Sequence, residues 1–363
     1  MAVAQRRMVA LVREAKGWSQ RQLADAAGVS QGFVSKVESG LLELRGEQLE
    51  KITTALGCPA ELLFDDTPLR GLEVTCLHHR RRSSQLNATT VKQIEALTHL
   101  TRVSVEGLLH GIELVPEGQL IAIDIDEVAD PAEIARRLRA AWRVPSGPIA
   151  NLTELIEAAG VIIVQRQLGT GSQDAVSSWP HEQDRAPMMV VNAGLSADRY
   201  RFTLAHELGH LVMHRLPSDS QEKEANLFAA EFLAPARDIG ASLTGLTTRD
   251  LSTFLALKQQ WGISIAALMQ RALDLGKITD RQFREMRVQL GRLGWRDFEP
   301  GTVPSETPAT LERVISTHRT DHGYSVQELA AVARMSEEAF RRHYRVTDTD
   351  RPRSRLHLVP EAT

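Results

Sequence analysis

The segment from Arg201 to His214 places three histidines four residues apart, with a glutamate directly after the first. Residues four apart lie one above the other on a helix, so His206 and His210 are placed to bind a single metal ion. Glu207 then lies beside that ion, where it can accept a proton from water. This H-E-x-x-H pattern is typical of zinc-dependent peptidases and predicts peptide hydrolysis with Glu207 as general base.

His214 continues the stripe but is not expected to bind the same ion. Eight residues of helix rise roughly 12 Å, whereas two atoms bound to one zinc ion lie only about 4 Å apart. The longer histidine pattern of the metzincins also fails, because Met213 and Leu216 stand at the positions of its glycine and third histidine. The third ligand is therefore expected from another segment.

The helix predicted over 221–235 is the better source of that ligand. Its small alanines would let it approach the first helix closely, and Glu222 is the carboxylate expected to reach the metal. Asn226, one turn further, is expected to hold one of the ligands from behind. Glu224 and Glu231 point about 200° away and are poorer ligands. The alternative for Glu222 is a solvated surface carboxylate.

The helix that carries the motif is expected to be largely buried, because its leucines recur at helical spacing. Peptide hydrolysis also needs a donor to the developing oxyanion. Tyr200, His181 and His214 are candidates for that donor, and the choice among them stays open.

The N-terminal segment from Trp18 to Gly40 predicts a helix, a turn and a second helix. Ser19 and Ser30 are suitable N-caps for the two helices, and Gly28 suits a left-handed residue between them. The outer face of the second helix is then available to a DNA major groove. The alternative is a helical hairpin with a packing role only.

The side chains expected to contact DNA lie on this outer face and at the start of the first helix. Gln31 and Ser35 are expected to face bases, whereas Lys36 and the first helix are expected to contact phosphates. Residues 1–40 carry six basic and three acidic side chains, a local positive balance that suits this role. The complete expected set is Gln20, Arg21, Ser30, Gln31, Gly32, Ser35 and Lys36.

Composition sets further bounds. A chain of 363 residues suggests two or three domains, and its net charge of −3 gives no global basic field. Cys58 and Cys76 match neither a zinc finger nor a disulfide framework, which favours a reducing cytoplasm. No apolar run approaches transmembrane length and no signal peptide is recognisable, so we expect a soluble cytoplasmic protein without a membrane partner.

The expected fold class is mainly α with a small β-sheet. Strands predicted at 161–164 and 188–192 alternate with helices, which favours an α+β domain of the zincin kind. An all-α helix-turn-helix bundle precedes this domain and a helical region follows it. The expected divisions are a DNA-binding domain at 1–66, a helical linker region at 67–129, a peptidase domain at 130–235, a helical domain at 236–300, a C-terminal helical module at 301–346 and a disordered tail at 347–363.

The C-terminal region predicts two further helix pairs. Residues 247–261 and 265–274 form a second arrangement like a helix-turn-helix, and 325–344 form a third. In the third pair, Arg334 stands in the turn where a glycine would be expected. Such pairs usually have a packing role, so DNA contact is the less favoured reading here.

Two family resemblances follow from these motifs. Residues 6–64 resemble the Cro/C1 (Xre) family of repressor DNA-binding domains. The motif R-x-F-T-L-A-H-E-L-G-H, followed by E-x-E-A-N-x-F-A-A-E-F-L-x-P, resembles the ImmA/IrrE family of metallo-endopeptidases over about 130–235. The second resemblance implies His206, His210 and Glu222 as metal ligands and Glu207 as general base. Ala234 departs from the methionine usual in that family but lies outside the site.

The resemblances also imply a function. They indicate a transcription regulator that binds a double-stranded operator as a homodimer and carries a Zn²⁺ peptidase, with Mn²⁺ as an alternative metal. The implied substrate is an Xre-type repressor or a co-encoded protein, cut in a stress or mobile-element response; self-cleavage after residue 66 is the runner-up. The alternative is a non-proteolytic repressor or antitoxin whose peptidase-like domain only senses a metal or a partner.

Overall fold

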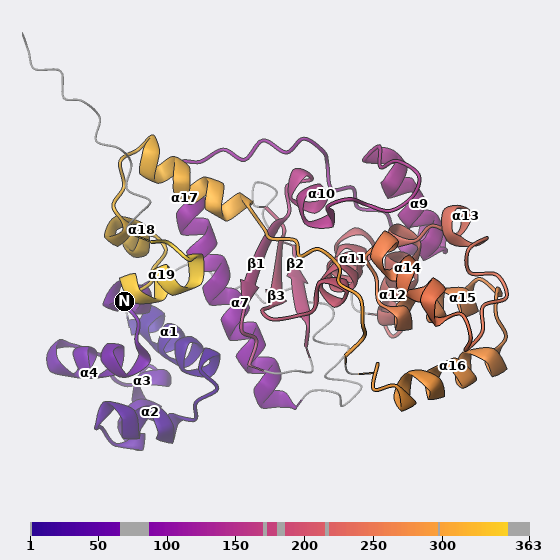
Figure 1. Cartoon of the computed structure of the whole chain (residues 1–363). Coiled ribbons are helices and arrows are strands. Elements are labelled where there is room, and N and C mark those ends of the chain that lie inside the picture. Colours follow the sequence, from indigo (N-terminus) through magenta and orange to yellow (C-terminus); the bar gives the residue numbers. More distant parts are fainter. Residues whose placement is uncertain are drawn as a thin grey trace, which may run out of the picture. The chain divides into compact units, whose positions relative to one another are not determined.

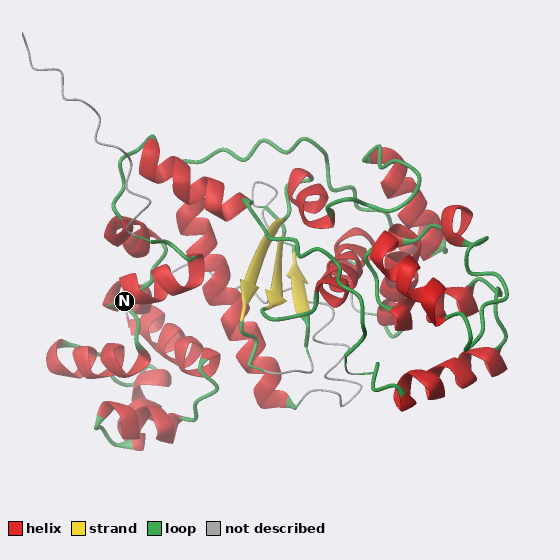
Figure 2. Ribbon diagram, viewed as in Figure 1, coloured by secondary structure: helices red, strands yellow, loops and turns green. Residues whose placement is uncertain are grey.

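The computed structural model describes residues 2–65, 87–169, 173–179, 186–214, 218–296 and 298–347. Helices dominate these residues and three short strands form a sheet (Figure 2), which confirms the expected fold class. Cys76, His181, Leu216 and the predicted disordered tail beyond Thr347 lie outside the described residues.

The chain folds into two compact units. The helical unit comprises residues 1–68, 99–113 and 309–363, and the sheet unit comprises 69–98 and 114–308. The expected N-terminal bundle therefore shares a unit with helices from two later parts of the chain. The expected peptidase domain shares the other unit with the helices that follow it.

The helical unit contains both the N-terminal bundle and the C-terminal helices (Figure 1). Its elements are α1 (Ala2–Ala15), α2 (Gln20–Ala27), α3 (Gln31–Glu38), α4 (Gly46–Leu56), α5 (Ala60–Leu63), the second half of α7 (Ala88–Leu109), α17 (Thr310–Thr320), α18 (Val326–Val332) and α19 (Glu337–Tyr344). Within the expected helical linker region of 67–129, residues 88–109 form the single helix α7.

The capping signals of the first helix pair are confirmed. Ser19 Oγ accepts a hydrogen bond from the backbone N–H of Gln22 at 3.2 Å, and the Gln22 side chain accepts one from the Ser19 N–H at 2.8 Å. Gly28 is left-handed, with φ of 63°. Ser30 Oγ accepts from the N–H of Phe33 at 3.2 Å. These local interactions set where α2 ends and α3 begins.

The helix pair α18–α19 repeats this arrangement with one departure. Arg334 occupies the left-handed turn position, with φ of 54°, where a glycine would be unstrained. Its guanidinium donates to Asp65 at 3.3 Å. Glu337 and Glu338 are exposed in the first turn of α19, where their charge opposes contact with phosphate. These charges favour a packing role for α18 and α19 over DNA contact.

In the sheet unit, helices pack against the strands (Figure 1). Its elements are the first half of α7 (residues 88–98), α8 (Ile125–Val128), α9 (Pro131–Ala141), α10 (Leu152–Ala158), β1 (Ile162–Arg166), β2 (Ala175–Ser178), β3 (Met188–Asn192), α11 (Ala197–Met213), α12 (Gln221–Leu233), α13 (Ala236–Ile239), α14 (Leu251–Trp261), α15 (Ile265–Asp274) and α16 (Asp280–Arg292).

The sheet has the strand order β1-β3-β2. β3 pairs in parallel with β1, with Ile163 opposite Met189, and antiparallel with β2, with Val176 opposite Val190. β1 and β3 were predicted from their apolar runs, although β1 begins and ends later than expected. β2 was not predicted, because four residues that include two serines give little apolar signal.

Helix α11 lies in the core of the sheet unit. It packs against β2 and β3 on one side and against α10 and α12 on others, and most of its side chains are buried. Buried residues of α11 include charged ones, Asp198, Arg201 and Glu207 among them. A buried charge needs a partner, so the surroundings of α11 must supply several.

One such partner comes from the extended segment between α16 and α17. The carboxylate of Glu306 accepts hydrogen bonds from the backbone N–H groups of Leu152 at 3.1 Å and Thr153 at 2.9 Å, at the start of α10. The same carboxylate forms an ion pair with Arg201 of α11, and the two side chains are only 6% and 5% exposed. Glu306 thus joins α10 to α11.

Replacing Glu306 with alanine is expected to lower the free energy of unfolding of the sheet unit by about 3 kcal/mol, because it leaves the Arg201 cation buried without its counter-charge. Urea denaturation followed by circular dichroism measures the change. The control is Glu285→Ala, which removes an exposed carboxylate on α16 and is expected to change stability by less than about 0.5 kcal/mol. Equal stability of Glu306→Ala and wild type would contradict the anchoring role.

Candidate metal centre and nucleic-acid interface

The candidate metal centre lies where α11 and α12 approach each other closely. Gly209 faces α12, and a Cβ atom added there would lie 3.1 Å from Cδ1 of Phe228 and 3.3 Å from Cα of Ala225. Such distances leave little room for a side chain at residue 209. Glycine on one helix and alanine on the other therefore bring the backbones close enough for α12 to reach the histidines of α11.

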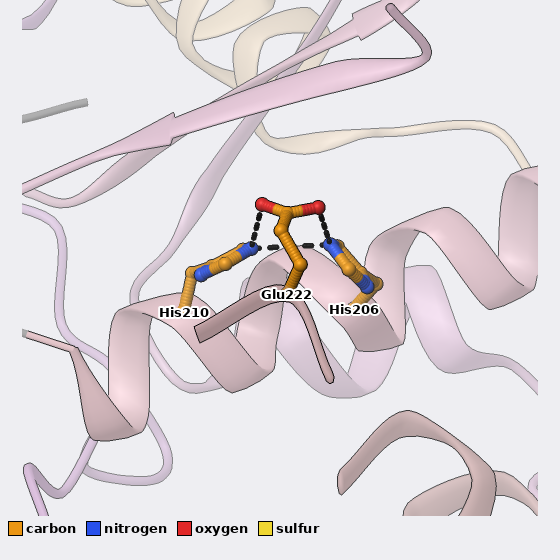
Figure 3. A group of neighbouring side chains, drawn as sticks. All are labelled: His206, His210 and Glu222. Carbon is orange, nitrogen blue, oxygen red and sulfur yellow. Dashed lines mark hydrogen bonds and ion pairs between the residues drawn. The ribbon is translucent and has the colours of Figure 1, made fainter. Parts of the chain in front are cut away.

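His206, His210 and Glu222 come together at this crossing (Figure 3). The Nε2 atoms of the two histidines are 3.1 Å apart. Glu222 reaches over from α12, with Oε2 at 3.7 Å from His206 Nε2 and Oε1 at 3.4 Å from His210 Nε2. One donor atom from each residue lies within 4.8 Å of the others.

The donor set suits a zinc ion. Two imidazole nitrogens and one carboxylate are ligands that zinc takes in peptidases, with a fourth position left for water or substrate. The 3.1 Å between the two Nε2 atoms, and the 3.7 and 3.4 Å from the Nε2 atoms of His206 and His210 to Oε2 and Oε1 of Glu222 respectively, are close to the roughly 3.3 Å that separates ligands about 2.0 Å from a tetrahedral ion. The residues present therefore fit a zinc ion, with the two Nε2 atoms facing it.

Each of the two histidines is also held from behind. His206 Nδ1 lies 3.0 Å from Oδ1 of Asn226 on α12. His210 Nδ1 lies 2.9 Å from Nδ1 of His214, and His214 Nε2 lies 3.0 Å from Oε2 of Glu224. Burial lowers the pKa of His214 to about 4, which favours a neutral ring at pH 7. His214 and Glu224 are thus close to the centre without belonging to its donor set.

Glu207 is buried beside the two histidines and accepts a hydrogen bond at 2.6 Å from the hydroxyl of Ser177 on β2. A second contact joins the same strand end to α11, because the indole N–H of Trp179 donates to the carbonyl of Leu211 at 2.7 Å. The carboxylate is therefore oriented by the sheet as well as by its own helix.

The three candidate oxyanion donors are His181, Tyr200 and His214. His181 lies outside the described residues. The hydroxyl of Tyr200 is buried near Thr153 and Gln165, and burial raises its pKa to about 12. Both ring nitrogens of His214 face other side chains. Neither described candidate offers its donor to a substrate.

The predicted DNA-contacting side chains lie at the start of α2 and along α3 of the helical unit. Gln31 donates to the side-chain oxygen of Gln20 at 2.8 Å, and Gln20 donates to Oε2 of Glu38 at 2.8 Å. Arg13 pairs with the same glutamate, with Nε at 2.6 Å from Oε1. This chain of contacts orients Gln31 at the first turn of α3. The other predicted contacts, Arg21, Ser30, Gly32 and Lys36, are exposed, and Ser35 is partly buried.

Comparison with protein families agrees with both regions. Residues 9–63 match the helix-turn-helix family model, and residues 156–273 match the peptidase-family model described as an IrrE N-terminal-like domain. The chain thus contains one region similar to each of these two families. No curated protein matches the chain. The IrrE-like match includes His206, His210 and Glu222 and continues through α15, beyond the expected end of the peptidase domain at residue 235.

In the part of the chain that the structure describes, no helix is long and apolar enough to cross a bilayer.

The contacts that sequence reasoning missed include two beside the candidate metal centre, the one from Ser177 to Glu207 and the one from Glu224 to His214. Ser177 gave no signal, because its strand was not predicted. The stripe of histidines at four-residue spacing did single out His214, but as a third ligand that helix geometry excluded and as a candidate oxyanion donor, not as a partner of His210.

Zinc content tests this donor set. Wild-type protein loaded with zinc and passed through a desalting column is expected to hold about one zinc ion per chain, and His210→Ala and Glu222→Ala are expected to lose it, because each removes one of three protein ligands. Elemental analysis by mass spectrometry measures the ratio. His110→Ala removes an exposed histidine and serves as the control. Full zinc content in His210→Ala would place the metal elsewhere.

Proposed function

We propose that this chain is a DNA-binding transcription regulator that carries a zinc-dependent endopeptidase. The observation that carries the proposal is the cluster of His206, His210 and Glu222 with Glu207 beside it, in a region matched by a peptidase family. The three clustered residues are the proposed metal ligands, and Glu207 is the proposed general base. Mn²⁺ is the alternative metal.

The protein side chains have separate parts in the proposed reaction. A zinc ion held by the three ligands would polarise the scissile carbonyl and lower the pKa of water at the site. Glu207 accepts a proton from the attacking water and passes it to the nitrogen of the leaving amine as the C–N bond breaks. Ser177, whose hydroxyl donates to Glu207 at 2.6 Å, holds the carboxylate in the orientation that this transfer needs.

Strand β2 is the proposed substrate-binding strand. It is an outer strand of the sheet, and Ser177 on it contacts the general base. An extended peptide that pairs with such a strand would present its backbone carbonyl groups alongside α11. This arrangement favours an unfolded or loop segment of a protein substrate over a folded helix.

The fusion to a helix-turn-helix domain indicates the kind of substrate. A dimer bound at its own operator would raise the effective concentration of the peptidase near any other regulator at that promoter. We therefore propose an Xre-type repressor or a co-encoded protein as the substrate, in a stress or mobile-element response. Self-cleavage after residue 66 is the second possibility that the same experiment tests.

Cleavage is expected when the zinc-loaded protein is incubated with proteins encoded by its genomic neighbours. Glu207→Gln is expected to keep its zinc but to cleave at least about 100-fold more slowly, because it cannot accept the proton. Intact-mass spectrometry of the mixture identifies both the substrate and the bond. A zinc-loaded wild type that leaves every neighbour and itself intact would favour a metal or partner sensor instead.

Two substitutions in the helix-turn-helix domain are expected to change operator binding in different ways, one through base contacts and one through phosphate contacts. Gln31→Ala is expected to reduce the preference for the operator over mutated sites, since a good base contact contributes about 1–3 kcal/mol. Lys36→Ala is expected to weaken binding to all sequences and to lower the salt-dependence slope by about one. Fluorescence anisotropy at several salt concentrations measures both effects. An unchanged sequence preference in Gln31→Ala would remove that residue from base recognition.

A further inference from the structure

We propose that His214 and Glu224 are positioning residues that hold His210 in the geometry needed to bind metal. The proposal rests on the proposed function, because it assigns a role to residues behind one of the proposed ligands. Neither residue belongs to the donor set formed by His206, His210 and Glu222. Their place is on the side of His210 that faces away from that set.

The distances describe a continuous hydrogen-bonded chain. Glu224 Oε2 is 3.0 Å from His214 Nε2, and His214 Nδ1 is 2.9 Å from His210 Nδ1. His210 Nε2 in turn faces His206 and Glu222. The chain therefore runs from a carboxylate, through one imidazole, to the back of a second imidazole whose front nitrogen is a proposed metal donor.

Only one arrangement of protons satisfies every contact in this chain when His210 binds a metal. A metal-binding Nε2 carries no proton, so the neutral ring of His210 must carry its proton on Nδ1. That N–H can donate only if His214 Nδ1 accepts, which places the proton of His214 on Nε2. This second N–H then donates to Glu224. The carboxylate at the end of the chain thus selects the tautomer of both rings.

Burial of the two imidazole rings makes this arrangement of protons strongly favoured over others. His210 and His214 are 2% and 4% exposed, so water cannot readily replace the contact between them. A buried N–H or ring nitrogen without a partner is costly, and the ring of His210 is thereby discouraged from rotating away. The negative charge of Glu224 also makes His210 a more basic ligand, as carboxylates behind metal-bound histidines generally do.

The spacing of residues on α12 explains how the start of this helix contacts both the proposed ligands and the residue behind one of them. Glu222 and Glu224 both lie in the first turn of α12. The first reaches the front nitrogens of the histidines, whereas the second reaches His214 at the C-terminal end of α11. Asn226 contacts the back of His206 at 3.0 Å. Both proposed histidine ligands are therefore supported from α12, one directly and one through His214.

Metal affinity tests the proposal without relying on catalysis. The zinc dissociation constants of wild type, His214→Leu, Glu224→Gln and the double variant are measured by competition with a chromophoric chelator. His214→Leu is expected to weaken zinc binding by about 10- to 100-fold, the usual effect of removing a partner behind a ligand. Glu224→Gln, which keeps an acceptor but loses the charge, is expected to weaken it less. Glu285→Gln, an exposed change on α16, is the charge-matched control.

The double variant distinguishes a shared chain from general damage to the fold. If Glu224 acts through His214, then Glu224→Gln is expected to have almost no further effect on zinc affinity in the His214→Leu background. The visible absorption spectrum of the cobalt-substituted protein is also expected to change in His214→Leu, because the orientation of one ligand changes. Independent effects of the two substitutions, or a wild-type affinity and spectrum in His214→Leu, would overturn the proposal.

This outcome is distinguishable from a failure of the proposed function. Wild-type protein that takes up no zinc would overturn both the metal centre and this proposal. Wild-type protein that binds zinc, together with an unchanged affinity in His214→Leu, would overturn the positioning role alone. Circular dichroism spectra and melting curves of each variant, compared with those of wild type, exclude unfolding as the cause of a weakened affinity.

Discussion

The candidate site depends on how closely α11 and α12 pack. Gly209 presents no side chain to α12, and Phe228 and Ala225 fill the space where its Cβ atom would lie. At a more usual helix separation the side chain of Glu222 would no longer lie within reach of both histidine nitrogens. Close packing of small residues is therefore a condition for the chemistry, although none of these residues takes part in it.

A second constraint follows from the burial of α11. A helix in the core of a small α+β unit is usually apolar, but this one buries acidic, basic and imidazole groups together. Each of these groups needs a partner in a region of low dielectric. Asp198, for example, pairs with Lys258 of α14 at 2.8 Å, and Arg201 pairs with Glu306 beyond α16. The buried charged groups of α11 thus make contacts with distant segments necessary to the fold of the sheet unit.

These long-range partners mark the limit of what the sequence predicted. The spacing of His206 and His210, the reach of Glu222 and the caps of α2 and α3 follow from helix periodicity and local hydrogen bonding, so a single sequence contains them. Ser177 and Glu306 act across 30 and 105 residues respectively. No local pattern identifies such pairs, because their proximity arises only when the tertiary structure forms. The membership of the C-terminal helices in the helical unit has the same origin.

The contacts that α12 makes with α11 couple the candidate metal site to the packing of the two helices. Glu222, Glu224 and Asn226 each contact a different part of the histidine stripe on α11, and all three contacts require the same relative placement of the two helices. A shift of one helix along the other would therefore disturb the donor set and both supports at once. Metal binding and helix packing are coupled in such an arrangement, because the ion adds its binding free energy only to the packed state. The same contacts that orient the ligands thereby make the packed form of α11 and α12 the one that a metal ion would stabilise.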